Sequence, residues 1–117
     1  MSEHPGTLEE FRHYREKMNE AILNAGNLGI KRFFALDTRT YEAGALDVKT
    51  KELLGLVASM VLRCDDCVTY HTIRCREEGV TDDEFYDALS VALVVGGSIV
   101  IPHLRRAVAR LEELPKA

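Results

Sequence analysis

Two T-x-x-E sequences mark where helices begin in this chain of 117 residues. In Thr7 to Glu10 and in Thr81 to Glu84, the threonine hydroxyl can accept from the amide three residues on, while the glutamate reaches back to the threonine amide. Each box precedes apolar residues at helical spacing. No segment shows sustained strand-like alternation, and no Asn-Gly or Asp-Gly turn is present. The sequence therefore predicts an all-α fold.

Glycines and capping residues divide the chain into about six helices. We expect them at about 8–23, 28–41, 48–62, 65–79, 82–96 and 98–114, the third capped by Asp47. The stretch 53–62 is apolar on nearly every side, as is typical of a helix buried by several neighbours. Pro102 fits in the first turns of the last helix. With no linker or repeat, residues 1–117 are expected to form a single domain.

Charge and hydropathy exclude several classes of function. Fifteen Lys and Arg against nineteen Asp and Glu give a net charge of -4, so no basic field is present to attract nucleic acid. The longest nearly apolar run, 88–101, is shorter than the roughly 18 residues that suggest a membrane span. Residues 1–11 do not resemble a secretion signal, so we expect a cytoplasmic protein. His4 and His13 are expected at the surface.

Cysteine and histidine residues gather in one short segment. Cys64 and Cys67 form a C-x-x-C sequence, and His71 follows four residues later. If the helix extends back through Cys64, these three residues and Cys75 lie within about 80° of one face. Three cysteines in a reducing compartment are not a disulfide framework, so their spacing needs another explanation.

A C-x-x-C sequence at a helix N-terminus suits thiol redox chemistry. The helix amides stabilise a thiolate, and the imidazole of His71 can take the thiol proton. The second cysteine can then close a disulfide. Cys75 lies about 12 Å along the axis from Cys67, so we expect it to be a buried small hydrophobe. Asp65 and Asp66 are expected to cap the helix.

Two alternatives give the same residues other roles. The cysteines can simply fill core volume, because thiols are among the most buried side chains. Alternatively, Cys64, Cys67 and His71 can bind zinc, with Cys75, His103 or a carboxylate as the fourth ligand. Otherwise we expect His103 to sit in the last helix, without a role at the site.

Glu52 stands near the start of the apolar helix, twelve residues before Cys64. A partly desolvated carboxylate at this position could exchange protons with His71. The competing interpretation is a solvated glutamate that interacts with the helix dipole.

These residues resemble an active-site pattern. Glu52 followed by Cys64-x-x-Cys67-x-x-x-His71 is similar to the AhpD-like alkylhydroperoxidase branch of the carboxymuconolactone decarboxylase family, over residues 46–111. The resemblance implies that Glu52 and His71 form a proton relay, often through water, and that the two cysteines are the redox pair. It also implies an all-helical fold in a homotrimer or homohexamer, with active sites near subunit contacts.

The function implied is that of a thiol-dependent peroxidase or disulfide oxidoreductase. His71 withdraws the proton of Cys67, the thiolate attacks a hydroperoxide or other small-molecule substrate, and Cys64 closes the disulfide. An external dithiol or redox protein restores the dithiol, with no bound cofactor or metal. Which cysteine reacts first stays open, because we expect Cys64 to be the more exposed. Some peroxidase members have a histidine between the cysteines where this chain has Asp66.

Two other functions remain as hypotheses. The first is a cofactor-free decarboxylase acting on a small lactone carboxylate, the chemistry in the family name. Such members typically lack the C-x-x-C pair, whose presence argues against this function. The second is a metal-binding or purely structural oligomer.

Overall fold

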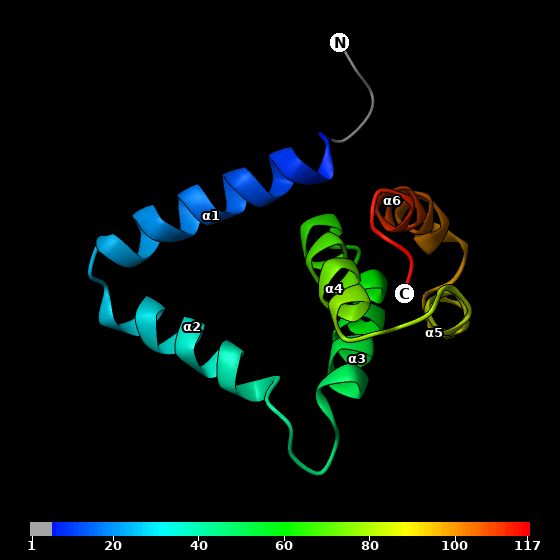
Figure 1. The fold of residues 1–117 in the computed structure, drawn as a ribbon, viewed down its shortest axis with the longest axis horizontal. Helices are drawn as coiled ribbons and strands as arrows, with labels where there is room; N and C mark the ends of the chain where they lie inside the picture. The colour runs from blue at the N-terminus through cyan, green and yellow to red at the C-terminus, as the bar shows by residue number, and fades with distance from the viewer. Residues whose placement is uncertain (1–5) are drawn as a thin grey trace. The chain divides into compact units, whose positions relative to one another are not determined.

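The computed structural model describes residues 6–117 and is helical throughout, with no strand among these residues. The elements are α1 (Leu8–Asn24), α2 (Leu28–Thr40), α3 (Val48–Val61), α4 (Asp65–Glu77), α5 (Asp82–Gly96), the 3₁₀ helix η1 (Ser98–Val100) and α6 (Ile101–Glu112) (Figure 1). The predicted all-α fold with six α-helices is confirmed. His13 is exposed as expected, whereas His4 lies outside the described residues.

The chain divides into two compact units, Met1–Glu42, described from residue 6, and Ala43–Ala117. In the first unit, the amide of Thr7 donates to Glu10 at 2.7 Å, and the amide of Glu10 donates to the Thr7 hydroxyl at 3.1 Å. Both bonds of the predicted capping box are therefore present. Gly26, with φ 81°, lies between α1 and α2, and Asn27 caps α2.

The local signals of the second unit also set its helix boundaries. Asp47 accepts from the amide of Thr50 at 2.8 Å at the start of α3, and the Thr81 capping box starts α5. The last helix differs from the prediction, because Ser98–Val100 is a 3₁₀ turn and α6 begins at Ile101. Gly97 has φ 84°, which ends α5, and Pro102 lies in the first turn of α6 as expected.

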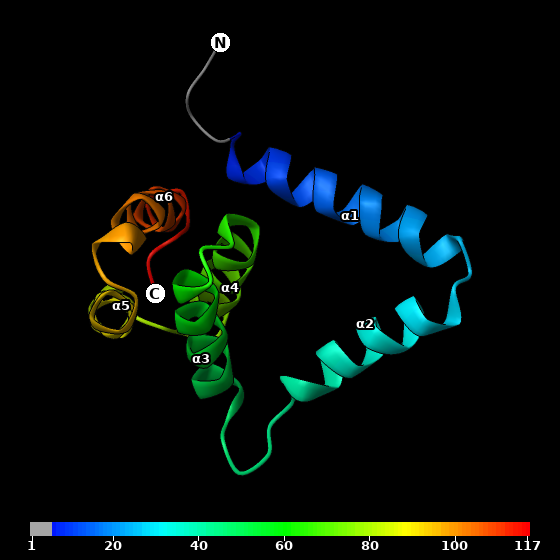
Figure 2. The same cartoon turned by 180° about the vertical axis from the view of Figure 1, so that it is seen from behind.

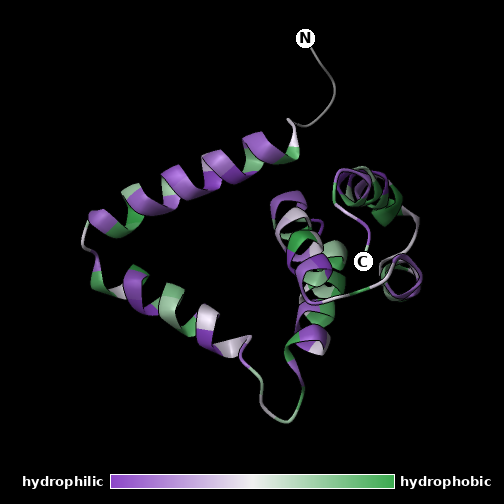
Figure 3. Cartoon of the chain, viewed as in Figure 1, coloured by the Kyte–Doolittle hydropathy of each residue, from purple (hydrophilic) through white to green (hydrophobic). Residues whose placement is uncertain are grey.

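Four helices form the core of the second unit. Helix α3 packs against α4 and α5, and α4 packs against α6 (Figures 1 and 2). The core cluster consists of Leu56, Met60, Val68, Cys75, Val80, Phe85, Leu89, Ala92, Val100, Ala107 and Leu111. Hydrophobic residues run along α3, whereas α1 is mainly hydrophilic (Figure 3).

The burial of α3 on several sides is not observed. Leu56 and Met60 are fully buried, but Leu54 is 54% exposed and Leu62, the residue after the helix, is 77% exposed. The expectation is wrong for the single chain, because α4 and α5 cover only part of the apolar surface.

The predicted single domain over 1–117 stays a prediction. Within the described residues, no helix is both long and apolar enough to cross a membrane.

Candidate active site

A tight turn between α3 and α4 places the C-x-x-C sequence. The amide of Arg63 donates to Met60 at 3.0 Å, and the amide of Cys64 donates to Ser59 at 3.1 Å. This pattern ends a helix through a residue in the left-handed region, usually glycine. Here Arg63 takes that role with φ 61°, the one described residue other than glycine with positive φ. The chain then turns directly into α4.

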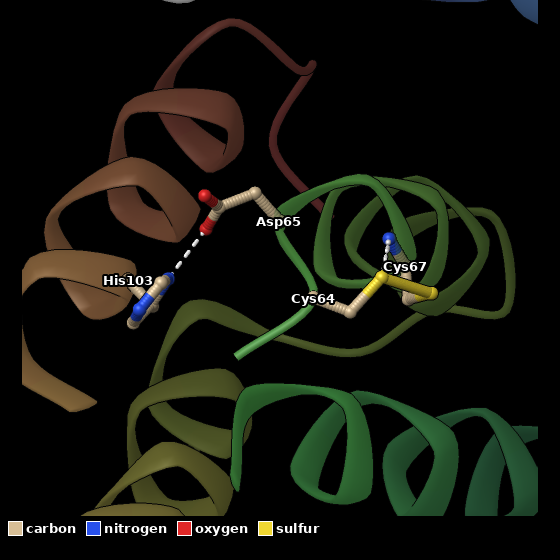
Figure 4. The surroundings of a disulfide bond; sticks show 4 residues. All are labelled: Cys64, Asp65, Cys67 and His103. Atoms are coloured by element: carbon tan, nitrogen blue, oxygen red, sulfur yellow. Dashed lines mark hydrogen bonds and ion pairs between the residues drawn. A yellow bond between two sulfur atoms is a disulfide. The ribbon is translucent and has the colours of Figure 1, made fainter. Parts of the chain in front are cut away.

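Cys64 and Cys67 form a disulfide at the start of α4 (Figure 4). Their Cα atoms are 5.3 Å apart, and the amide of Cys67 donates to the sulfur of Cys64 at 3.3 Å. Cys64 is therefore the N-cap of α4. The expected capping role of Asp65 is wrong, because its carboxylate binds His103 of α6 instead. Asp66 is exposed, and Cys64 fills the capping position.

The three cysteines differ in exposure. Cys67 is exposed and Cys64 is half-buried, so the expectation that Cys64 is the more exposed is wrong. Cys64 is the less exposed of the two because its sulfur, at the N-cap, accepts from a backbone amide. Cys67 lies within the first turn of α4. Cys75 is 1% exposed and forms no disulfide, as expected of a buried small hydrophobe. Burial, helped by the nearby Glu52 carboxylate, raises the pKa of Cys75 to about 12.

Glu52 and His71 meet across two helices. Oε1 of Glu52, on α3, lies 2.8 Å from Nδ1 of His71, on α4. The two residues are 1% and 8% exposed, so the solvated alternative for Glu52 is wrong. Because Nδ1 faces Glu52, proton exchange with a cysteine would use Nε2. His71 follows Cys67 by one helical turn.

The same residues lie within a family match. The carboxymuconolactone decarboxylase family matches residues 30–110, more than half of the chain. The chain belongs to this family.

Two solved structures and one sequence relative agree with this membership. A carboxymuconolactone decarboxylase family protein from Thermotoga maritima, for which an antioxidative role has been suggested, is 62% identical, with a TM-score of 0.85 over 89% of this chain and 88% of that one. A family protein from Legionella pneumophila is 25% identical, with a TM-score of 0.66 over 90% and 87%. Protein 4 of the cox locus of Paracoccus denitrificans is 32% identical over 73% of this chain and 77% of its own length.

Sequence reasoning missed Arg74. Its Nε lies 3.4 Å from Oε2 of Glu52, on the opposite oxygen from His71. A residue three positions after His71 shares its face of the helix, and this spacing was the available signal. Which of the two glutamate oxygens it meets depends on the packing of α3 against α4.

His103 lies in α6, as expected, and it also reaches the redox segment. Its Nδ1 lies 2.7 Å from Oδ1 of Asp65, and Arg106 of α6 binds the other oxygen of Asp65. The Asp65 side chain and the disulfide extend in different directions from the backbone (Figure 4). Within residues 6–117, no three His, Cys, Asp or Glu side chains are grouped closely enough to hold a metal ion. The zinc alternative therefore has no ligand set in this part of the chain.

Proposed function

We propose that this family member is a thiol-dependent peroxidase or disulfide oxidoreductase of the AhpD-like branch. The observation that carries the proposal is the position of the Cys64–Cys67 disulfide, one helical turn from a buried Glu52–His71 pair. A carboxylate that orients an imidazole beside a cysteine pair is a general device for activating a thiol. The antioxidative role suggested for the Thermotoga maritima relative is in keeping with this chemistry.

The cycle starts from the reduced pair. His71 takes the proton of Cys67, and the thiolate attacks one peroxide oxygen, which breaks the O–O bond. Cys67 becomes a sulfenic acid, and the alkoxide leaves as an alcohol with the proton from His71. The Cys64 thiol then displaces hydroxide as water and forms the disulfide. An external dithiol or redox protein reduces the disulfide and is itself oxidised to a disulfide.

Exposure supports this order of the two cysteines. Cys67 is exposed and can meet a substrate from solution, whereas half-buried Cys64 suits the resolving role. The same exposure makes Cys67 the accessible sulfur for an incoming reductant. We therefore assign the attack on the peroxide to Cys67.

Turnover of a hydroperoxide with an external dithiol tests the proposal. We expect Cys67→Ser and Cys64→Ser to lower turnover by at least 100-fold, because each removes half of the redox pair. His71→Ala is expected to lower it by about 100-fold, the scale of general base catalysis. Cys75→Ala is the matched control and should retain turnover, because Cys75 forms no disulfide.

Two results would count against the proposed peroxidase function. If neither single change in the redox pair alters turnover, and both thiols titrate near the reference value of about 8.5, the proposal fails. Decay of a lactone's ultraviolet absorbance that survives replacement of both Cys64 and Cys67 by serine would favour the decarboxylase chemistry of the family name instead.

Assembly and location are parts of the same proposal. Val94 is 87% exposed and Val95 is 67% exposed on α5. Neighbouring apolar side chains that are this exposed are typical of a protein–protein contact surface. We assign this surface to contacts between copies, in a homotrimer or homohexamer.

A cycle that depends on an external dithiol fits a reducing compartment, so we assign the protein to the cytoplasm. A hydroperoxide or another small molecule is the substrate, with no nucleic acid or membrane partner.

A further inference from the structure

Both oxygens of the buried Glu52 carboxylate have a partner on α4. Oε1 lies 2.8 Å from Nδ1 of His71, and Oε2 lies 3.4 Å from Nε of Arg74. The Glu52 side chain is 2% exposed, and that of Arg74 is 27% exposed. Because a buried carboxylate is costly without compensation, a partly buried cation on its second oxygen offsets part of that cost.

Two further carboxylates hold the Arg74 guanidinium in place. One terminal nitrogen lies 2.6 Å from Oε1 of Glu77, and the other lies 3.0 Å from Oε2 of Glu78. All three guanidinium nitrogens therefore face a carboxylate. The hydrogen bond to Glu77 is the main cause that raises the pKa of Arg74, so the guanidinium stays charged.

Other titratable groups contact Arg74 and Glu52 from α3 and α4. Helix α3 contributes Glu52, and α4 contributes His71, Glu77 and Glu78. Cys75 also lies near Glu52 and Arg74, but with a pKa of about 12 it is uncharged at neutral pH. Glu77 is 52% exposed, so solvent screens it, whereas Glu52 is buried against Arg74. Of the three carboxylates that Arg74 contacts, Glu52 is the buried one that also contacts His71.

We propose that Arg74 is a positioning residue of the Glu52–His71 relay: it holds the second oxygen of Glu52 and so fixes the orientation and the negative charge that the carboxylate presents to His71. This proposal rests on the proposed function, because it assigns a role within the same thiol chemistry. Arg74 acts through Glu52 and does not itself touch the reacting sulfur.

The loss of the positive charge of Arg74 determines the direction in which the ionisation of Cys67 should shift. Removal of a positive charge makes every nearby acid hold its proton to higher pH. In Arg74→Met, transfer of the Cys67 proton to His71 is therefore expected to be weaker, and the thiolate should form only at higher pH. Methionine keeps much of the apolar stem of the side chain, so the change falls mainly on the charge.

The experiment measures alkylation of Cys67 by iodoacetamide against pH in reduced Cys64→Ser protein, which requires no peroxide turnover. We expect Arg74→Met to move the midpoint upward by about half to one pH unit, or three- to tenfold slower alkylation below the midpoint. Arg74→Lys keeps the charge and should stay within about 0.2 units of the parent. Arg105→Met, the same substitution at an exposed position of α6, is the matched control and should also stay within about 0.2 units.

A double substitution separates a positioning role from a direct one. In a Glu52→Gln background, Arg74→Met should move the midpoint by only about 0.2 units, because the group through which Arg74 acts is gone. An equal shift in both backgrounds overturns the proposal, since Arg74 would then act directly on the thiolate. No shift in either background also overturns it, even if thermal stability falls.

The experiments distinguish failure of the proposed peroxidase function from failure of the positioning role of Arg74. If Arg74→Met shifts alkylation but the parent protein consumes no hydroperoxide, the positioning role stands and the peroxidase function fails. If His71→Ala shifts alkylation and Arg74→Met does not, the relay stands and the role of Arg74 fails.

Discussion

At the residue scale, chemistry in this protein follows from unequal burial of similar groups. Cys67 is exposed at the start of α4, whereas Cys75, two turns further along the same helix, is 1% exposed. Glu52 is 1% exposed, whereas Glu77 has a side chain that is 52% exposed. Residue type therefore determines which reactions a side chain can take part in, and its burial determines whether it does so.

Cys75 gives a prediction at this scale. Burial raises its pKa to about 12, so its thiol remains protonated and inaccessible in the folded protein. At pH 8, iodoacetamide should label two of the three cysteines of the reduced native protein and the third only after denaturation, as mass spectrometry would record. Rapid labelling of all three thiols in the folded protein would contradict the assigned burial.

The same thiol predicts a dependence of stability on pH. The folded-state pKa of about 12 exceeds the ordinary value of 9.0, so the protonated thiol favours folding fully below about pH 9. That contribution falls as the pH rises from about 9 toward 12. The free energy of unfolding should therefore decline less steeply over this range in Cys75→Ala than in the parent, measured by urea titration.

At the element scale, the start of α4 is held from two sides. The turn through Arg63 links it to α3, and the carboxylate of Asp65 links it to His103 and Arg106 of α6. The amide of Cys67 completes the turn by donating to the sulfur of Cys64. The redox segment is thus fixed by helix packing as well as by its own cap.

Loss of the Asp65 contact between α4 and α6 should lower the stability of the protein. We expect Asp65→Ala to lower stability by about 1 kcal/mol, because a partly exposed charged contact between two helices is lost. For a domain of this size, that corresponds to a fall of about 4 °C in Tm. Asp66→Ala, at the exposed neighbouring position, should cost only a few tenths of a kcal/mol, about the value of one helix-dipole contact.

Thermal unfolding of the reduced and the oxidised forms of both variants provides the measurement. Equal losses in Asp65→Ala and Asp66→Ala would show that the contacts with α6 add nothing beyond the helix dipole.

At the scale of the whole molecule, exposed apolar side chains lie near the redox segment. A Cβ at Gly96, the last residue of α5, would lie 3.8 Å from a methyl group of Val61, the last residue of α3. The end of α5 therefore lies beside the turn that leads to Cys64. Val94, Val95 and Ile99, all more than half exposed, are at or near this end.

The oligomer that we propose is tested at this surface. Val94 is 87% exposed, so Val94→Asp should leave the fold of the single chain intact but place an unpaired charge between copies. We expect light scattering to report a homotrimer or homohexamer for the parent and a smaller species for Val94→Asp. Ala109→Asp, which adds the same charge at an exposed position of α6, is the control and should keep the parent's size.

Two results would count against this assignment. A parent protein that scatters as a 13.1 kDa monomer would contradict the oligomer. An oligomer of unchanged size in Val94→Asp would exclude the end of α5 from the interface.

Much of the fold could be predicted because helix ends are local. The capping boxes at Thr7 and Thr81 and the Asp47 cap each join groups three residues apart, so short segments of sequence contain both partners. The 3₁₀ turn at Ser98–Val100 was not predicted, because short 3₁₀ turns are frequent at the N-termini of α-helices and have no sequence pattern of their own here. The capping role of Cys64 was also missed, since Asp65 and Asp66 are the better caps by residue type alone.

The sequence by itself determined that this is an all-helical chain and that two cysteines lie at the start of one helix, with a histidine one turn further along. Only the tertiary structure decided the partners of those residues, because Glu52 meets His71 across 19 residues and His103 meets Asp65 across 38. It also decided that Cys67 is more exposed than Cys64 and that Arg74 reaches the second oxygen of Glu52. The physical reason is range: caps and helical faces depend on neighbours within one turn, whereas burial and charge pairing depend on which helices pack together.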